Sequence, residues 1–298
     1  MKFFKRISFG DIVFEFFALL VVTLLGIACL FPILYTFSAS ISDPKAFLEG
    51  RVKLFPVGFS LGAYERVLET PLIWSYYYNT VWYTVVGTIF NLTATVLLAY
   101  PLSKRNFVLK GPISFLVVFT MFFGGGLIPT FLLVNNLGLY GTRWVMPLIG
   151  LVNTFNTIIA RTFFQSLPEE LFDCARIEGA SEFRILLKIV LPLSTSIIAV
   201  LGLYYGVAHW NTFFNALIYL PKREMQPIQV MLRRLVLENN SQEMHALGVP
   251  TVVSVATVMI SNQIKYAVIF FAMFPVMCLY PFLQKYFVKG VMLGALKG

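Results

Sequence analysis

One short motif in the chain has residue types that could do covalent chemistry. Gly58-Phe59-Ser60-Leu61-Gly62 has the G-x-S-x-G spacing that presents a nucleophilic serine in many hydrolases. That arrangement requires a buried strand before the serine and a histidine base. Pro56 stands just before the motif instead, and the two histidines, His209 and His245, lie far along the chain. The motif therefore does not predict a hydrolase.

Other catalytic and metal-binding patterns are missing from the sequence. ATP hydrolysis needs a phosphate-binding loop, G-x-x-x-x-G-K-[ST], and the dipeptide Gly-Lys does not occur. The three cysteines, Cys29, Cys174 and Cys278, have no spacing for a disulfide framework or a metal site. The sequence predicts a non-enzymatic chain with no catalytic residue, no metal site and no cofactor of its own.

One long polar stretch, residues 163–192, has the pattern of two short helices joined by a turn. Ser166 and Glu169 have the spacing of a capping box at the start of the first helix. Gly179 suits the left-handed conformation that ends a helix. Ser181 can cap the second helix, which should run to Pro192 because proline ends helices. The stretch therefore predicts a helical hairpin.

The first helix of this hairpin has an apolar stripe and a charged flank. Leu171, Ala175 and Glu178 follow the spacing of one helix face, with Phe172 alongside. A short helix of this kind, held at a membrane surface, is typical of a docking element. An ordinary connection between two spans is the alternative.

The same stretch resembles the cytoplasmic signature of the membrane subunits of binding-protein-dependent ABC importers. That signature is EAA, three residues, Gly, nine residues and I-x-L-P. This chain has Asp173-Cys174-Ala175, Gly179 and Ile189-Val190-Leu191-Pro192 at matching spacing, with Asp in place of Glu and Cys in place of the first Ala. Residues 284–298 look like the C-terminus of carbohydrate importer permeases of the maltose-transporter class, and within that class of the second, six-span permease. Residues 107–140 look like the branch that accompanies polysaccharide-degradation loci, which imports polysaccharides or oligosaccharides.

This resemblance implies a coupling helix that sits in a groove of a separate ATPase subunit, which holds ATP and Mg²⁺. It also implies a second, homologous permease as heterodimeric partner and an extracytoplasmic solute-binding protein, and it involves no nucleic acid. The residues expected to couple to the ATPase lie in the signature segment: Glu170, Asp173, Cys174, Ala175, Glu178, Gly179, Ile189, Leu191 and Pro192.

Composition places the chain in a lipid bilayer. Of its 298 residues 58% are hydrophobic and only 12% are charged, which is too apolar for an ordinary soluble domain. A helix crosses a bilayer with roughly 20 apolar residues. Uncharged runs of suitable length predict six spans, at residues 16–42, 76–103, 112–136, 144–160, 193–220 and 266–284. Residues 246–263 are expected to lie outside the membrane or to be re-entrant.

Charge predicts the orientation of these spans only weakly. With the N-terminus inside, the cytoplasmic segments carry the larger share of the 23 Lys and Arg residues. The resemblance gives the same orientation, since the hairpin must meet a cytoplasmic ATPase. We therefore expect a multi-pass protein of the bacterial cytoplasmic (inner) membrane with both termini in the cytoplasm.

Polar and aromatic residues within two spans could line a sugar pathway. Polar groups at membrane depth are costly and face a cavity or a partner. Structural hydrogen bonds between helices explain them equally well. The pathway candidates are Asn153, Asn156, Tyr204, Tyr205, Trp210 and Asn211, and the span at 193–220 also offers His209. Three glycines, 124–126, either break the third span or let helices pack closely, and the second reading is favoured.

The loops and the tail carry further expectations. Residues 42–75 should be extracytoplasmic, with an amphipathic helix at 61–72. In the loop 222–265, residues 231–234 and 238–240 are candidates for contact with the binding protein. The tail from Lys285, with Lys297 and Gly298 at its end, either regulates the ATPase or anchors the chain.

The sequence therefore predicts an all-α integral membrane protein with six transmembrane helices and a cytoplasmic coupling-helix hairpin, the type I ABC importer permease fold. Three regions are expected: residues 1–75, a transmembrane core at 76–284 that contains segment 163–192, and a tail at 285–298. The predicted function is ATP-driven import of oligosaccharides. The alternatives are an ion-coupled secondary transporter, although all 14 acidic residues fall outside the predicted spans, and an ABC permease for a non-sugar solute.

Overall fold

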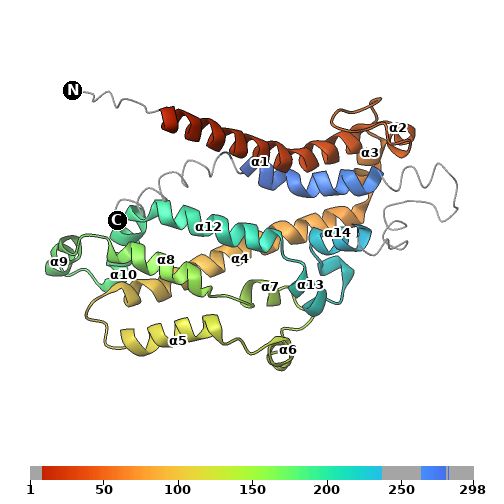
Figure 1. Ribbon diagram of the computed structural model, residues 1–298. Coiled ribbons are helices and arrows are strands. Elements are labelled where there is room, and N and C mark those ends of the chain that lie inside the picture. Colours follow the sequence, from red (N-terminus) through yellow and green to blue (C-terminus); the bar gives the residue numbers. More distant parts are fainter. Residues whose placement is uncertain (1–8, 237–262, 280, 282–298) are drawn as a thin grey trace. The chain divides into compact units, whose positions relative to one another are not determined.

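The computed structural model describes residues 9–236, 263–279 and 281, and in these residues the chain is helical (Figure 1). Contacts divide the chain into two units. Unit 1 comprises Met1–Pro71 and Leu235–Phe271, and unit 2 comprises Leu72–Arg234 and Ala272–Gly298.

Unit 1 contains a long apolar helix and a small folded segment that follows it. The helices are α1 (Phe9–Ile41), α2 (Pro44–Leu48) and α3 (Gly62–Glu69), and most of the helix at Gln263–Leu279 also belongs here. Ser40 Oγ lies 2.7 Å from the hydroxyl of Tyr64 and thereby joins the end of α1 to α3. Asp43 caps α2 by accepting the backbone N–H of Lys45 at 2.8 Å.

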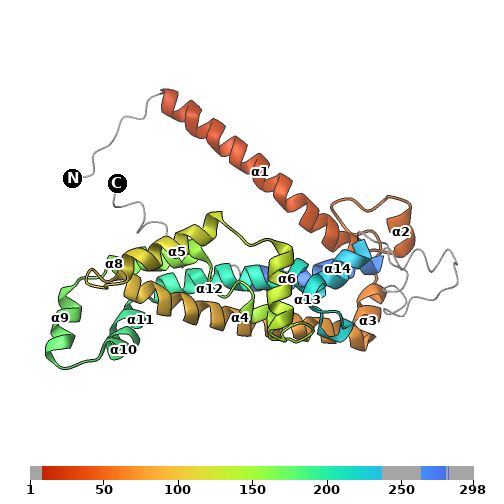
Figure 2. The ribbon, with the colours of Figure 1, turned by 90° about the horizontal axis from the view of Figure 1, so that it is seen from below.

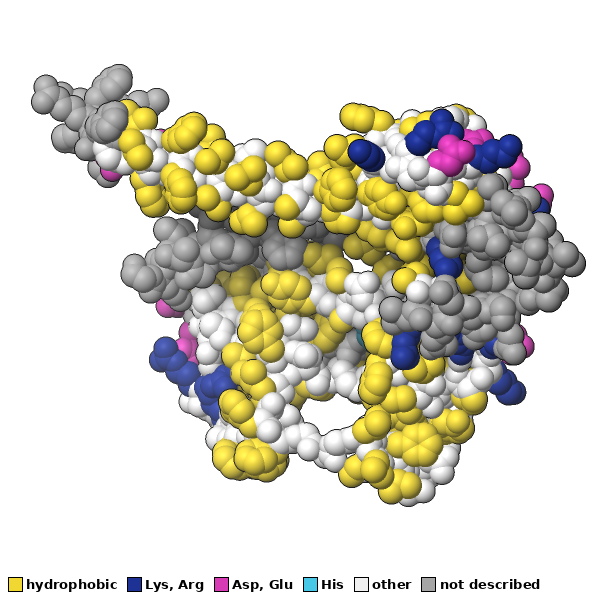
Figure 3. Space-filling model, turned by 45° about the vertical axis from the view of Figure 1, so that its right-hand side comes forward, with side chains coloured by type: hydrophobic (Ala, Val, Ile, Leu, Met, Phe, Trp, Pro, Cys, Tyr) yellow, Lys and Arg dark blue, Asp and Glu magenta, His cyan; other side chains and the backbone are white. Residues whose placement is uncertain are grey.

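α1 has the composition of a membrane span. Its most apolar window has a mean hydropathy of 2.7, and none of that window is buried. Figure 3 shows hydrophobic side chains over much of one face of the molecule. So large an exposed apolar surface marks contact with lipid or a partner. The predicted amphipathic helix at 61–72 is shorter than expected, because α3 ends at Glu69 and the next helix already begins at Pro71.

Unit 2 is built on one long helix, α4 (Pro71–Ser103), whose first residue falls in unit 1. Figures 1 and 2 show α9 and α10 at one end of α4, and α13 at the other. The remaining helices of the unit are shorter: α5 (Lys110–Phe122), α6 (Leu127–Asn136), α7 (Val145–Leu148), α8 (Thr154–Gln165), α9 (Glu170–Ile177), α10 (Glu182–Ile185), η1 (a π-helical turn, Leu186–Val190), α11 (Leu191–Leu193), α12 (Thr195–Trp210), α13 (Phe214–Tyr219) and η2 (a 3₁₀ turn, Arg223–Met225). α14 (Ile228–Val236) crosses the division between the units.

The expected spans 112–136, 144–160 and 193–220 are not single helices. The chain bends by 118° between α5 and α6, and by 84° at Ser194 between α11 and α12. Residues 149–153 separate α7 from α8, and residues 211–213 separate α12 from α13. Among the described residues, α1 and α4 are long and apolar enough to span a membrane, each bent pair could form one further span, and Gln263–Leu279 is a shorter apolar helix. The count of six spans therefore stays a prediction.

The glycines at 124–126 break the third span rather than pack it. Gly126 has φ +80°, a conformation that a side chain makes costly. Among the described residues, a Cβ on Gly124 or Gly126 would meet no atom within 4 Å, so none of the described helices approaches closely there. The close-packing interpretation was therefore wrong.

Two clusters of buried residues form the core of unit 2. At one end, residues of α4, α8, α9, α10, η1 and α12 pack together, with Ala99, Ala160 and Ile185 fully buried. At the other end, residues of α4, α6, α7, α13 and α14 do the same around Tyr83. The first cluster positions the hairpin that the sequence singled out.

Candidate functional site

The predicted turn of the hairpin is a glycine-terminated helix end. Gly179 has φ +76°. Its N–H donates to the carbonyl of Arg176 at 2.9 Å, and the N–H of Ala180 donates to the carbonyl of Ala175 at 2.9 Å. This pair of bonds is the Schellman motif, which satisfies carbonyls that the end of α9 would otherwise leave free. Ser181 caps α10 as predicted, accepting the N–H of Arg184.

The predicted capping box does not form. Ser166 ends α8, and its hydroxyl donates to the carbonyl of Phe163 at 2.7 Å. Because that hydroxyl is engaged by the preceding helix, α9 starts with no side-chain cap at Glu169. Pro168 lies before the helix rather than in its first turn.

α9 has one buried face and one exposed face. Phe172 and Ala175 are buried, against Val96, Ala99 and Tyr100 of α4 among others. Leu171, expected on the apolar stripe, is 42% exposed. The buried face of α9 is therefore centred on Phe172 and Ala175 rather than on Leu171. Neighbouring residues in a helix point about 100° apart, so Leu171 cannot share the direction of Phe172.

A chain of charged and polar side chains connects α9, α10 and α4. Arg176 donates to Asp173 Oδ1 and to Glu182 Oε1, each at 3.0 Å. The hydroxyl of Tyr100 donates to Glu182 Oε2 at 2.6 Å. Burial alone would raise the pKa of the Glu182 carboxyl, but the hydrogen bonds from Tyr100 and Arg176 and the charges of Arg176 and Lys104 outweigh it and lower that pKa.

Lys104 follows the last residue of α4, and its side chain contacts the buried face of α9. Its Nζ lies 3.4 Å from the centroid of the Phe172 ring and 4.6 Å from that of Tyr100. The atom is buried and has no hydrogen-bond partner among the described residues. Burial lowers the pKa of Lys104, and the carboxylate of Glu182 opposes this. The cation is thus held by aromatic faces.

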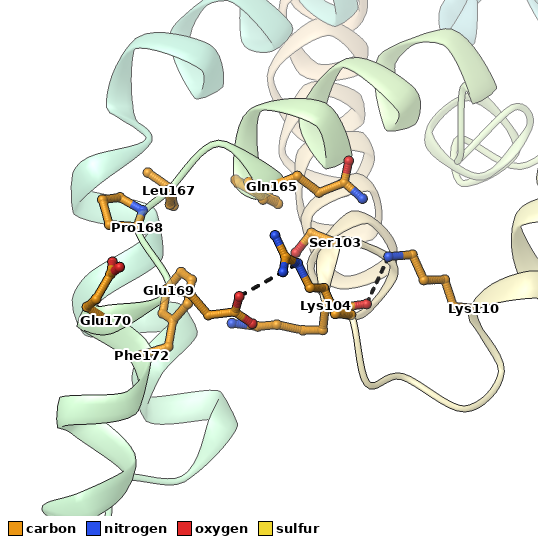
Figure 4. A pocket seen from close by; sticks show the side chains of 11 residues that line it. Ser103, Lys104, Lys110, Gln165, Leu167, Pro168, Glu169, Glu170 and Phe172 are labelled. Carbon is orange, nitrogen blue, oxygen red and sulfur yellow. Dashed lines mark hydrogen bonds and ion pairs between the residues drawn. The ribbon is translucent and has the colours of Figure 1, made fainter.

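Beside this contact lies a cavity of about 640 Å³ between the end of α4 and the start of α9 (Figure 4). Figure 4 shows Lys104 next to Phe172, and a dashed line that joins Lys110 to the carbonyl of Lys104. The Arg105–Glu169 pair is long, 3.7 Å, and exposed, so it contributes little.

Of the other predicted coupling residues, some are exposed on the surface and others are packed against the core. Glu170, Cys174 and Glu178 are exposed on α9, and Asp173 is exposed but already paired with Arg176. Ile189 and Leu191 are half-buried against the core cluster, so they support the hairpin. Pro192 is exposed and follows the π-helical turn.

Within the spans of unit 2, polar side chains surround a smaller cavity of about 180 Å³. Asn91 is buried and donates to the carbonyls of Gly150 and Leu151, at 3.1 and 2.7 Å. Its Oδ1 lies 2.5 Å from His209 Nε2. The polar side chains that line the cavity are Asn91, Asn153, Tyr205, His209, Thr212 and Asn215.

Only two of the six predicted pathway residues line this cavity. Asn153 also caps α8, and the hydroxyl of Tyr205 is 2.7 Å from that of Thr95. The other four do not line it. Asn156 is buried, Tyr204 is 40% exposed, Trp210 donates to the carbonyl of Ala272 at 3.1 Å, and Asn211 bonds the carbonyl of Val207 in its own helix at 2.9 Å.

The residues expected to contact the binding protein, 231–234 and 238–240, lie only partly within the described structure. Met231 is fully buried, so it cannot contact a binding protein, and Arg233 lies over the Phe213 ring at 5.6 Å. Residues 238–240, the stretch 246–262 and the tail from Lys285 lie outside the described residues.

Sequence reasoning missed three residues that hold the hairpin and the cavity together: Asn91, Tyr100 and Lys104. One signal was available for the second and third. Tyr100 and Lys104 are four residues apart at the end of a span, so they share a helix face.

Comparison with known proteins places this geometry in a family. A sequence model of the family described as binding-protein-dependent transport system inner membrane component matches residues 91–293, more than half of the chain. The match includes the hairpin, Lys104 and the polar cavity.

Individual relatives extend over nearly the whole chain. The polygalacturonan/rhamnogalacturonan transport system permease protein YtcP of Bacillus subtilis (strain 168) is 39% identical over 92% of this chain and 94% of its own. The arabinooligosaccharides transport system permease protein AraQ of Halalkalibacterium halodurans is 27% identical over 90% and 91%. A crystal structure of a bacterial ABC transporter involved in the import of the acidic polysaccharide alginate matches with a TM-score of 0.85 at 33% identity, covering 96% of this chain and 100% of that one.

Proposed function

Because the chain belongs to the family of binding-protein-dependent transport system inner membrane components, we propose that it is the permease subunit of an ATP-driven importer of oligosaccharides. It forms half of the translocation pathway beside a second, homologous permease. A separate ATPase dimer, which binds ATP and Mg²⁺, supplies the energy, and an extracytoplasmic solute-binding protein delivers the sugar.

The exposed face of α9 is the observation that carries the coupling part of this proposal. Leu171 is 42% exposed and Ile177 is 87% exposed, with the Cys174 thiol exposed between them. Apolar side chains on a charged surface helix favour a protein partner. The opposite face of α9 is buried in the chain's own core, so a partner that moves α9 also acts on unit 2.

The proposed topology has six spans with both termini in the cytoplasm. α9 then lies on the cytoplasmic side, where an ATPase is found. The bent pairs α5–α6 and α11–α12 supply one span each, and irregular backbone at their bends is tolerated where it faces protein or a water-filled cavity. Segments 1–75, 76–284 and 285–298 keep the roles expected from the sequence.

We propose oligosaccharides that carry carboxylates as the substrates. Two of the similar proteins are described as transporting polygalacturonan or alginate. Asn153, Tyr205 and His209, with the newly found Asn91, are the pathway residues best placed to offer hydrogen bonds, because they line one cavity. Family membership rules out the ion-coupled alternative, and a non-sugar solute is an outcome of the test below.

The deciding experiment uses the whole transporter. The chain is purified with the ATPase and the paired permease, reconstituted in lipid nanodiscs and mixed with the binding protein. Short oligogalacturonates are expected to stimulate ATP hydrolysis more than maltodextrins of equal length. Stimulation by a non-sugar solute alone would overturn the sugar assignment.

Docking is tested separately through Cys174. In a background with Cys29→Ser and Cys278→Ser, the ATPase is expected to protect Cys174 from a thiol reagent. Equal labelling with and without the ATPase would show that α9 is not the docking helix.

A further inference from the structure

The end of α4 is joined to the hairpin by two connections, one from Tyr100 in its last turns and one from Lys104, the residue after its end. Tyr100 reaches α10 through Glu182, and Lys104 reaches α9 through Phe172. The two connections are in contact, because Lys104 Nζ also lies 4.6 Å from the centroid of the Tyr100 ring. Both helices of the hairpin are therefore held at the end of α4.

The Lys104 connection is unusual in its chemistry. A buried ammonium group is costly unless its charge is compensated. Lys104 Nζ is buried without a hydrogen-bond partner among the described residues, and the Phe172 and Tyr100 rings lie at 3.4 and 4.6 Å. Cation–π contacts strengthen when they are desolvated, as here. A lysine that only needed solvation could point outward, as its neighbour Arg105 does with 83% exposure.

We propose that Lys104 is a positioning residue that fixes α9 to the end of α4, so that movement imposed on α9 by the ATPase is passed to the span. The inference rests on the proposed coupling function of α9. Lys104 contacts the buried face of the helix, and the docking residues Leu171, Cys174 and Ile177 are exposed on the other face. Docking and transmission are therefore separable by mutation.

The test compares Lys104→Met with Lys104→Arg in the reconstituted transporter. Methionine keeps an apolar stem without the charge, and arginine keeps a cation that can stack on a ring. Lys104→Met is expected to lower oligogalacturonate-stimulated ATP hydrolysis about tenfold, within the range of typical coupling energies. Lys104→Arg is expected to retain most of the stimulation. Arg105→Met removes a neighbouring exposed cation and is the matched control, with stimulation unchanged.

Protection of Cys174 by the ATPase distinguishes docking of α9 from transmission of its movement to α4. We expect Lys104→Met to show the same protection as the parent chain, because the docking face is untouched. Loss of Cys174 protection in Lys104→Met would mean that Lys104 only maintains the hairpin. Full stimulation of ATP hydrolysis in the same variant would mean that Lys104 transmits no movement to the span. Either result overturns the positioning role, and so does an arginine variant as impaired as methionine.

Phe172→Leu provides a second route if Lys104→Met does not assemble. Leucine fills the buried site but removes the ring, so the same loss of stimulation with retained Cys174 protection is expected. A Phe172→Leu transporter that is stimulated like the parent would also overturn the proposal. If the parent chain itself shows neither stimulation nor Cys174 protection, the proposed function fails instead.

Discussion

Gly179 and Gly87 are both required to be glycine, but for different physical reasons. At Gly179 the backbone has φ +76°, and no atom of the described part of the chain lies within 4 Å of a built Cβ. At Gly87, within α4, a Cβ would overlap the ring of His209. The first glycine is needed for its conformation and the second for the close approach of a side chain. The two sites therefore respond differently to the same substitution.

Substitution of Gly179 tests the turn of the hairpin. Gly179→Val forces a branched side chain into the left-handed region, at a cost of about 1 kcal/mol or more. We expect loss of substrate-stimulated ATP hydrolysis with normal insertion into the membrane. Asparagine tolerates this conformation better, so Gly179→Asn is the control and should keep most of the activity. Normal stimulation in the valine variant would contradict the role of the turn.

Substitution of Gly87 tests packing around the polar cavity. Gly87→Val should destabilise the protein by about 1–3 kcal/mol through overpacking against His209. Thermal unfolding of the purified transporter measures this, with Gly111→Ala as a control, because no atom lies within 4 Å of a Cβ there. Adding His209→Ala should recover part of the loss. Independent, additive effects of the two changes would show that the ring does not set the limit.

At the scale of elements, the hairpin owes its position to a few directed contacts rather than to helix strength. α9 has eight residues and α10 four, both too short to be stable alone. The π-helical turn that follows, Leu186–Val190, ends two residues before Pro192. Proline cannot donate a hydrogen bond and displaces the carbonyl four residues earlier, which accounts for the irregular turn. Tertiary contacts with α4 and α8 hold the hairpin.

The connection through Glu182 predicts a pH dependence of the hairpin. The pKa of Glu182 is lower in the folded chain than its ordinary value of 4.5. Its hydrogen bonds therefore stabilise the hairpin above that value, and this stabilisation is lost as the pH falls through the lower, folded pKa. We expect proteolysis of residues 163–192 to accelerate in that acidic window.

Glu182→Gln is the matched variant for this pH effect, because the amide keeps the size of the side chain and cannot titrate. Its proteolysis rate should be higher than that of the parent at neutral pH and should lack the component caused by Glu182 on acidification. An identical acid response in parent and variant would rule out Glu182 as the titrating group.

At the scale of the whole molecule, the proposed topology predicts on which side of the membrane two exposed residues lie. The small folded segment of unit 1 carries Phe59, which is 75% exposed, and unit 2 carries Cys174 on α9. In the proposed topology α1 separates the N-terminus from the first of these, and the two sites lie on opposite sides of the bilayer.

Labelling with a membrane-impermeant thiol reagent tests this topology. In right-side-out cells, a Phe59→Cys variant without the native cysteines should react, whereas the chain with Cys174 as its sole cysteine should react only after the membrane is opened. Reaction of both from outside would overturn the orientation. The excess of Lys and Arg in the predicted cytoplasmic segments could not establish the orientation alone, because that excess is small.

Much of the architecture was predictable because it depends on local composition. Long apolar runs indicated α1 and α4, and the end of α4 at Ser103 agrees with the predicted span end. Gly179 and Ser181 act as predicted, because turns and caps depend on residues close in sequence. The breaks at 149–153 and 211–213 were not predicted, and a break at 124–126 was the less favoured of two readings, since hydropathy averages over a window and does not sense backbone direction.

The amino-acid sequence by itself determined the class of the protein, its apolar spans and the hairpin signature that placed it in its family. These follow from composition and from short spacings, which act within one helix or turn. Only the tertiary structure decided which face of α9 is buried and that Lys104 stacks on Phe172. Lys104 and Phe172 are about 70 positions apart, and no local rule predicts such a contact, because it depends on how whole helices pack.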